Sequence, residues 1–371
     1  MKNIILSTLL LLMNYSCNES INSDDIDVEA EIIKEMASEK IPSVVACIVR
    51  NDEIVWEGTF GLADKENSIA STRNTLYNIE SITKLFVATS IMQLWERGVI
   101  ELESDINQYL PFDVRNPNYP DSKITPHMLL NHTSSLAWPK AEDHLPDFEY
   151  FFSHDEVPLI SDWIPEYILP EGSQYRTAVW KGFQPGEQEL YSNIGVSLLA
   201  LIVENIIGMD FRDYCREFIL DPLEMYDSAF RIEYMDTELL ATPYYNSNYP
   251  VEQFVYRHYP AGNLKSNIKD FSHFISAYLN YGEYMGNRIL ERATIEKMYE
   301  IQNPVTGMAN LWNHRLGNYI GKYGGGTGYS AYVEWHFDSN IGIFIFSNKY
   351  NESVYPHGRT YELVRYQSNN Y

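Results

Sequence analysis

Cysteine is scarce in this sequence: the 371 residues include three, Cys17, Cys47 and Cys215. So few thiols cannot build the framework of several disulfides on which small secreted domains depend. Cys47 and Cys215 lie in apolar segments, one strand-like and one helix-like, and free, buried thiols are typical of such places. The sequence therefore predicts no disulfide framework.

Basic residues are also few. There are 27 Lys and Arg residues against 51 Asp and Glu residues, which gives a formal net charge of -24. A surface with this charge repels phosphate backbones and anionic lipid headgroups. We therefore expect no nucleic-acid partner, and the acidic excess indicates a solvated surface rather than a particular reaction.

The N-terminus lacks a hydrophobic run long enough to remain in a membrane as a spanning helix. Its apolar run, residues 4–13 after Lys2, has the length of an export signal. Small and polar residues lead from it to Cys17, as at a bacterial lipoprotein processing site. We expect residues 1–17 to be a signal peptide, Cys17 to carry a membrane-attaching lipid and residues 18–27 to be a polar tether. The alternative is simple cleavage of a soluble signal peptide. The protein is thus expected to be exported, as a periplasmic or cell-envelope lipoprotein of a bacterium.

Apolar and aromatic residues, by contrast, are plentiful. Hydrophobic residues make up 45% of the chain and aromatic residues 14%, with 29 tyrosines. This composition is typical of a packed globule. The chain is long for one ordinary domain but short for two large ones, so we expect residues 28–371 to form a single domain with two interlocked lobes.

Strand patterns lie near both ends of the chain. Residues 44–49 and 54–60 read as one hairpin, and residues 329–337 and 341–347 read as another. Helical patterns dominate between them. We therefore predict an α+β fold, in which N- and C-terminal strands form one antiparallel sheet, helices flank it, and a mainly helical lobe is inserted at about 80–260.

A serine and a lysine stand at the start of a strongly apolar helical pattern that stops at Gly98. Ser81 and Lys84 are three positions apart and share one helix face. A lysine in an apolar first turn loses hydration and opposes the helix dipole, and both effects lower its pKa. Such a lysine can accept a proton from a serine. In the alternative, structural interpretation, Ser81 caps the helix and Lys84 reaches to water.

Further motifs occur in order on both sides of Ser81 and Lys84. Together they resemble the class C β-lactamase and penicillin-binding-protein family, whose members include β-lactamases, D-alanyl-D-alanine peptidases and esterases. The resemblance covers nearly everything after about Ile41 and implies a β-lactamase/transpeptidase-like fold with one catalytic domain. It rests on residues 61–64, 76–80, 110–111, 124–125, 129–134, 185–186, 191–195, 222–225, 260–262 and Asn348.

The family's second motif, Tyr-x-Asn, matches Tyr191 and Asn193. The resemblance implies that Tyr191 is a proton shuttle, and neighbouring cations are expected to lower its pKa. Asn193 would orient Lys84 and the substrate amide by hydrogen bonds. Without the resemblance, the same residues indicate only a turn before an apolar helix.

The family's third motif, Lys-Thr-Gly or His-x-Gly, falls in a glycine-rich segment. We align it with Tyr323, Gly324 and Gly325, which puts an aromatic residue where a cation usually lies. Lys322 is expected to face the other side of the sheet, because neighbouring strand residues alternate.

The same segment would supply part of an oxyanion hole. The amides of Gly326 and Ser81 are expected to bind the oxyanion. The segment lacks the Gly-Lys-Ser/Thr signature of a phosphate loop, and the nine histidines form no metal-binding pattern. His132 is expected to be a structural hydrogen-bonding group. We therefore expect no metal and no cofactor.

These residues predict a serine hydrolase. Ser81 would attack a small ester or amide, either a small molecule or a peptide, and form an acyl-enzyme that water then releases. Without a cation at Tyr323, β-lactamase activity is expected to be weak or absent. The alternative is a catalytically silent binding or sensor module, in which a buried Glu80 keeps Lys84 protonated.

Overall fold

The computed structural model describes residues 26–371, apart from six gaps. The expected signal peptide, the lipid site Cys17 and nearly all of the tether lie outside the described residues. Within them, no single helix is long and apolar enough to cross a membrane. The helices at 193–207 and 211–220 reach the required length and composition only when they are counted as one, and the chain bends sharply between them. The gaps are residues 139–149, 152–156, 246–248, 303–307, 316–318 and 337.

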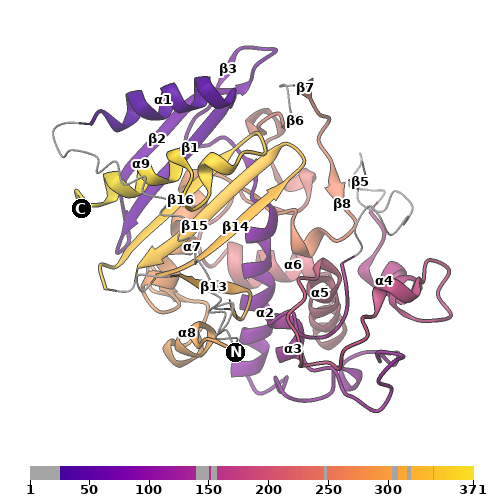
Figure 1. The fold of residues 1–371 in the computed structure, drawn as a ribbon. Helices are drawn as coiled ribbons and strands as arrows, with labels where there is room; N and C mark the ends of the chain where they lie inside the picture. Colours follow the sequence, from indigo (N-terminus) through magenta and orange to yellow (C-terminus); the bar gives the residue numbers. More distant parts are fainter. Residues whose placement is uncertain are drawn as a thin grey trace, which may run out of the picture.

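An antiparallel sheet lies at the centre of the described structure (Figure 1). Its eight described strands are β1 (Ser43–Arg50), β2 (Glu53–Asp64), β3 (Ile69–Ala70), β12 (Met308–Ala309), β13 (Trp312–Arg315), β14 (Tyr319–Gly326), β15 (Tyr329–His336) and β16 (Ile341–Ser347). Their spatial order is β12-β13-β14-β15-β16-β1-β2-β3. Strand β1 pairs with both β2 and β16, so strands from the two ends of the sequence meet at the middle of the sheet. The predicted α+β class and its mixed-terminus sheet are confirmed.

Both faces of the sheet are covered by helices. On one face lie α1 (Val28–Glu39) and α9 (Arg359–Ser368), and on the other lies α7 (Ile268–Leu279), as Figure 1 shows. Residues of β1 alternate between these layers: Val44, Ala46 and Ile48 join the α1 and α9 core, whereas Val45, Cys47 and Val49 join the large core with α7. Because both faces are buried, β1 is apolar at nearly every position.

A helical lobe packs beside the sheet. Helix α5 is at its centre and contacts α2, α3, α4 and α6. Cys215 and Cys47 are free, buried thiols, as expected. The helices of the lobe are α2 (Lys84–Glu96), α3 (Pro126–Leu130), α4 (Ile160–Ile168), α5 (Asn193–Ile207) and α6 (Phe211–Cys215), and α8 (Arg292–Tyr299) lies near the sheet.

Short two-stranded pairs lie outside the main sheet in the described part of the chain. The paired segments are β4 (Tyr77–Asn78) with β9 (Lys265–Ser266), β5 (Tyr150–Phe151) with β8 (Val255–Tyr256), β6 (Tyr244–Tyr245) with β7 (Tyr249–Pro250), and β10 (Glu283–Tyr284) with β11 (Asn287–Arg288). Two 3-10 turns, η1 (Glu80–Thr83) and η9 (Tyr259–Ala261), border the candidate site.

The helix expected to start at Ser81 begins with the turn η1, and α2 itself starts at Lys84. The residues preceding η1 and α2 make no side-chain capping hydrogen bond, so Ser81 is not the cap that the structural interpretation required. Glu80 has a φ of 50°, in the left-handed region that a residue with a side chain rarely occupies. The turn that carries Ser81 therefore has a strained backbone.

Candidate active site

Three of the predicted residues meet at one point between the sheet and the helical lobe. The Ser81 hydroxyl lies 2.8 Å from the Tyr191 hydroxyl and 3.0 Å from Lys84 Nζ. Lys84 Nζ also donates a hydrogen bond of 2.6 Å to the carbonyl of Ala261 in η9. The serine thus has a potential base on one side and a second hydroxyl on the other.

Lys84 is completely buried in the first turn of α2. Burial lowers the pKa of its ammonium group well below the ordinary value, and the positive charge of Lys322 lowers it further. Glu80 acts in the opposite direction as a smaller influence. The lowered pKa favours the neutral amine, whose lone pair can accept the Ser81 proton.

The expectation of a lowered pKa for Tyr191 is wrong. Burial of its hydroxyl raises the pKa, and the hydrogen bond to Ser81 offsets only part of that rise. Tyr323 and Glu80 raise it further, so the loss of hydration outweighs the lowering effect expected from neighbouring cations. Tyr191 is therefore a neutral phenol that can donate a proton, although 41% of the residue's surface is exposed at the cleft.

The expectation that Lys322 faces away from the site is also wrong. Its Nζ lies 5.8 Å from the centre of the Tyr191 ring, and Lys84 Nζ lies 4.9 Å from the same ring. The side chains of β14 do alternate between the two faces of the sheet, but each residue faces the side opposite to the one expected. Lys322 is paired with Val333 of the large core, whereas Tyr323 is paired with Tyr332 of the α9 layer.

Because Lys322 and not Tyr323 faces the site, the third motif begins one residue earlier than in the sequence alignment. Lys322 becomes the cation of a Lys-x-Gly motif, and Tyr323 occupies the following position. The Tyr323 ring packs 5.5 Å from the ring of Tyr355, at the outer rim. The cleft therefore contains the cation that the sequence alignment had left out.

The glycines of β14 bring its backbone against the serine turn. A side chain at Gly324 would meet the amide nitrogen of Ser81 at 2.7 Å. Strand β13 pairs with β14 only as far as Gly321, so the edge beyond Gly321 is open to the cleft. A glycine at this position is required for so close an approach of strand and turn.

The oxyanion partner expected at Gly326 moves by one residue as well. Gly326 pairs with Tyr329 across a two-residue turn, and in such a closing pair each N–H points at the carbonyl of the other residue. A side chain at Gly326 would also lie 2.5 Å from Glu80 Oε2. Because N–H groups alternate along a strand, we expect the amide of Gly325, one residue earlier, to point to the open edge.

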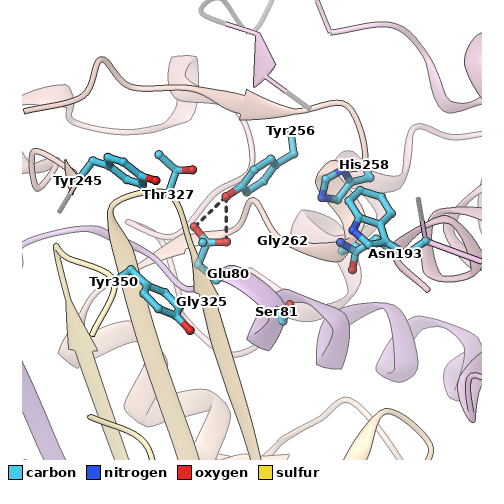
Figure 2. Close-up of a pocket in the computed structure, with 13 residues that line it drawn as sticks. Glu80, Ser81, Asn193, Tyr245, Tyr256, His258, Gly262, Gly325, Thr327 and Tyr350 are labelled. Carbon is cyan, nitrogen blue, oxygen red and sulfur yellow. Dashed lines mark hydrogen bonds between the residues drawn. The ribbon is translucent and has the colours of Figure 1, made fainter. Parts of the chain in front are cut away.

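Glu80 is buried behind the nucleophile. Burial raises the pKa of its carboxyl group to about 8, against smaller lowering effects from Tyr256, Lys265, Lys84 and Asn78. Figure 2 shows the carboxyl group directed at the Tyr256 hydroxyl, with O–O distances of 3.2 and 3.3 Å. At neutral pH Glu80 is mostly uncharged, so it does not hold Lys84 in the protonated form.

Two cavities of about 510 and 440 Å³ border Ser81. Ser81, Trp138, Asn193 and Gly325 line both of them. The larger cavity extends past Gly326 to several aromatic residues, and the smaller contains Tyr191, Lys322 and Tyr323. The remaining lining residues of the larger cavity are Glu80, Tyr245, Tyr256, His258, Ala261, Gly262, Thr327 and Tyr350 (Figure 2).

Asn193 lies in the cleft but does not orient Lys84 as expected. Within the described part of the chain, its side-chain oxygen is buried without a hydrogen-bond partner. Lys84 is held instead by Ser81 and by the carbonyl of Ala261. The free oxygen of Asn193 remains available to an amide group of a substrate.

Sequence reasoning missed several residues of the cleft. Trp138 comes from one segment and Tyr256 and His258 from another, and the His258 ring contacts the rings of both Trp138 and Tyr256. No local pattern marks them, because tertiary packing alone brings them together. Among the described residues, no group of three or more His, Cys, Asp or Glu side chains is placed to hold a metal ion.

Comparisons with known proteins agree with this geometry. Residues 28–366 match the sequence model of the beta-lactamase family. "Beta-lactamase-like protein 2" of Dictyostelium discoideum is 29% identical over 300 residues, which cover 74% of this chain and 50% of that protein. "Esterase EstB" of Burkholderia gladioli is 26% identical over 220 residues, covering 59% of this chain and 54% of that protein. The chain spans about half the length of these two curated relatives.

Solved structures give the same result. The "octameric penicillin-binding protein homologue from Pyrococcus abyssi" has a TM-score of 0.69 and 26% identity, covering 86% of this chain and 72% of that one. A class C beta-lactamase from Rhodobacter sphaeroides has a TM-score of 0.70 at 18% identity, covering 92% of this chain and 99% of that one, a likeness of fold.

Proposed function

Since the chain belongs to the beta-lactamase family, we propose that it is a serine hydrolase that forms an acyl-enzyme at Ser81. The observation that carries the proposal is the contact of the Ser81 hydroxyl with both Lys84 Nζ, at 3.0 Å, and the Tyr191 hydroxyl, at 2.8 Å. A nucleophile within hydrogen-bond reach of its base is the arrangement that such catalysis needs.

In the proposed first step, Ser81 attacks the carbonyl carbon of an ester or amide while neutral Lys84 accepts its proton. A bond forms between Ser81 Oγ and the carbonyl carbon, and the amides of Ser81 and Gly325 stabilise the oxyanion. The bond to the leaving group then breaks. Tyr191 donates its proton to the leaving oxygen or nitrogen and recovers one from Lys84.

In the second step, water attacks the acyl-enzyme. The same groups remove a proton from the water and return one to Ser81 Oγ, which releases the carboxylic acid. The raised pKa of Tyr191 means that the phenol carries a proton at neutral pH, and the lowered pKa of Lys84 supports its role as the base. The silent-module alternative required a charged Glu80, and the carboxyl pKa of about 8 argues against it.

The proposed substrates are small esters or amides, including those of short peptides. The two cavities on either side of Ser81 can hold an acyl group and a leaving group, and the open edge of β14 can pair with an extended amide. Lys322 gives the smaller cavity a positive charge, but the residue is only 3% exposed. Tyr323 adds a hydroxyl without charge at the rim. We therefore propose that neutral short-chain esters are hydrolysed with a higher kcat/KM than cephalosporins.

Titration with a fluorophosphonate, followed by peptide mass spectrometry, tests the proposed function. A stoichiometric adduct on Ser81, absent from Ser81→Ala, is the expected result, together with turnover of p-nitrophenyl esters by the wild type alone. An intact Ser81 in the labelled protein, or full turnover by Ser81→Ala in a pure preparation, would reject the proposal.

The preference for neutral substrates has its own test. A Lys322→Met variant should raise KM for a cephalosporin or a D-alanyl peptide and leave KM for a neutral ester within about threefold, because only the first two carry a carboxylate for the lysine to attract. Tyr323→Lys should reduce the difference in kcat/KM between the ester and the cephalosporin. A wild type that prefers cephalosporins would contradict the proposed substrate class.

A further inference from the structure

His132 accepts hydrogen bonds from the backbone on both sides of Tyr191. Its main-chain carbonyl accepts a 2.6 Å hydrogen bond from the amide of Leu190, and its ring Nδ1 accepts one of 3.3 Å from the amide of Ser192. Its ring also packs against the Tyr191 ring, with centres 4.6 Å apart. One residue therefore makes three contacts with the three-residue segment that carries the phenol.

These contacts join two elements of the helical lobe. His132 follows the C-terminus of α3, and Ser192 caps the N-terminus of α5 by accepting a 3.0 Å hydrogen bond from the amide of Gly195. The Tyr191 segment is thus tied to α3 through His132 and to α5 through Ser192. With both ends fixed, the phenol hydroxyl is held 2.8 Å from Ser81 Oγ.

The contacts require one protonation state of the ring. A backbone amide can only donate, so Nδ1 must be unprotonated and the proton of the neutral ring lies on Nε2. The ring is buried, and burial lowers the pKa of His132 well below its ordinary value, with further lowering from Lys322 and Lys84. The neutral ring that accepts from Ser192 is therefore the form present at neutral pH.

We propose that His132 is a positioning residue that fixes the Tyr191 hydroxyl against Ser81 through its ring acceptor and its ring face. The inference rests on the proposed function, because it gives Tyr191 the role of proton donor. His132 touches no reacting atom itself. Its effect should appear in the rate of acylation and deacylation, rather than in substrate binding.

The backbone of His132 determines which variants are informative. Its φ of 57° is tolerated by glycine and by asparagine, but poorly by bulky residues. His132→Gly removes both the acceptor and the ring, whereas His132→Asn restores a side-chain acceptor on a backbone that asparagine can adopt. His273 serves as a control, because its ring also packs on a tyrosine, Tyr284, at 4.5 Å, away from the cleft.

Kinetics with a p-nitrophenyl ester provide the test. We expect His132→Gly to lower kcat by about 10²-fold, the scale of a misplaced catalytic group, with KM within about threefold. His132→Asn should recover at least about tenfold of that loss, and His273→Asn should retain wild-type kcat. Retention of kcat by His132→Gly, or no recovery by His132→Asn, would overturn the proposal.

A double-mutant cycle separates positioning from a general loss of structure. If His132 acts through Tyr191, His132→Gly should cost little further rate in a Tyr191→Phe background. An equal loss in both backgrounds would overturn the inference while leaving the proposed function intact. Failure of the proposed function would instead appear in the wild type, as the absence of both turnover and a Ser81 adduct.

Discussion

At the scale of single residues, burial controls the charges around Ser81. Lys84 and Glu80 would be oppositely charged in water, but each is buried and each has its pKa moved towards the neutral form. Lys322 reinforces the change at Lys84. Burial therefore favours the neutral form of both groups, and Lys84 gains a charge when it accepts the Ser81 proton.

Replacement of the proton-transfer groups tests this description. Lys84→Ala and Tyr191→Phe should each lower kcat by about 10²-fold or more, the loss expected for a positioned acid or base. Both variants should still unfold cooperatively on heating, as followed by circular dichroism. A folded variant with a rate within threefold of wild type would remove that residue from the mechanism.

Glu80 predicts a dependence of stability on pH. Its folded-state pKa of about 8 lies above its ordinary value of 4.5, so the native state binds the proton more tightly than the unfolded state. The contribution is fully present below the ordinary pKa and is lost as the pH rises to about 8. Urea unfolding from pH 4.5 to 8 should show a steeper decline for wild type than for Glu80→Gln.

The neighbouring Lys265 affects stability in a different pH range, so its contribution can be separated from that of Glu80. Burial lowers its pKa to about 8 from 10.5, so its contribution to stability increases as the pH rises between those values. The Glu80→Gln comparison is therefore made below pH 8. Parallel curves for wild type and Glu80→Gln in that range would show that Glu80 ionises normally.

At the scale of elements, the packing of β14 against the turn η1 sets the geometry of the site. Gly324 allows this contact, because a side chain there would meet the carbonyl of Ile79 at 2.6 Å and the amide of Ser81 at 2.7 Å. Both are backbone atoms and cannot rotate away. The position of the Ser81 amide therefore depends on a missing side chain in a strand some 240 residues later in the sequence.

Gly324→Ala should separate β14 from η1 and lower kcat by at least about 10²-fold, because a displaced amide no longer stabilises the oxyanion. Gly182→Ala is the matched control, since an added side chain at Gly182 would have no atom within 4 Å. Ester kinetics for the two variants give the measurement. Equal and nearly normal rates would show that the strand can shift without disturbing Ser81.

The limits of sequence reasoning are clearest in the same strand. Strands β1 and β16 were predictable because their apolar runs have a length and flanking turns that fit buried strands. The phase of β14 was not, because three successive glycines carry no side chains that would reveal which face is buried. The alignment consequently placed Tyr323, and not Lys322, in the cleft.

Some residues of the site could be predicted from the sequence and others could not. Ser81, Lys84 and Tyr191 were found because their motifs are local and fixed in spacing. Tyr256 and Trp138 were not, because their place in the cleft depends on how separate segments pack. The pKa shift of Tyr191 was predicted in the wrong direction, because the burial of its hydroxyl depends on the tertiary fold and cannot be read from the sequence.

At the scale of the whole molecule, attachment to a membrane remains a prediction. We expect the mature protein to begin at Cys17 with a lipid on that residue, and residues 18–27 to connect it to the folded domain. Cys17→Ser should leave the precursor uncleaved or release a soluble protein. Cell fractionation and intact-mass analysis check this, and an unmodified N-terminus at another residue would contradict it.

The pairing of β1 with β16 also has a consequence for synthesis. The amide of Ser43 donates to the side chain of Asn348, 305 positions later, and Val44 lies opposite Ser347. Until the ribosome has made these last strands, β1 has one bare apolar edge, of the kind that associates with other chains. Contacts of such long range also form slowly. A chaperone that binds the nascent chain should therefore matter most between the completion of β2 and the arrival of β16, when the protein is most exposed to aggregation.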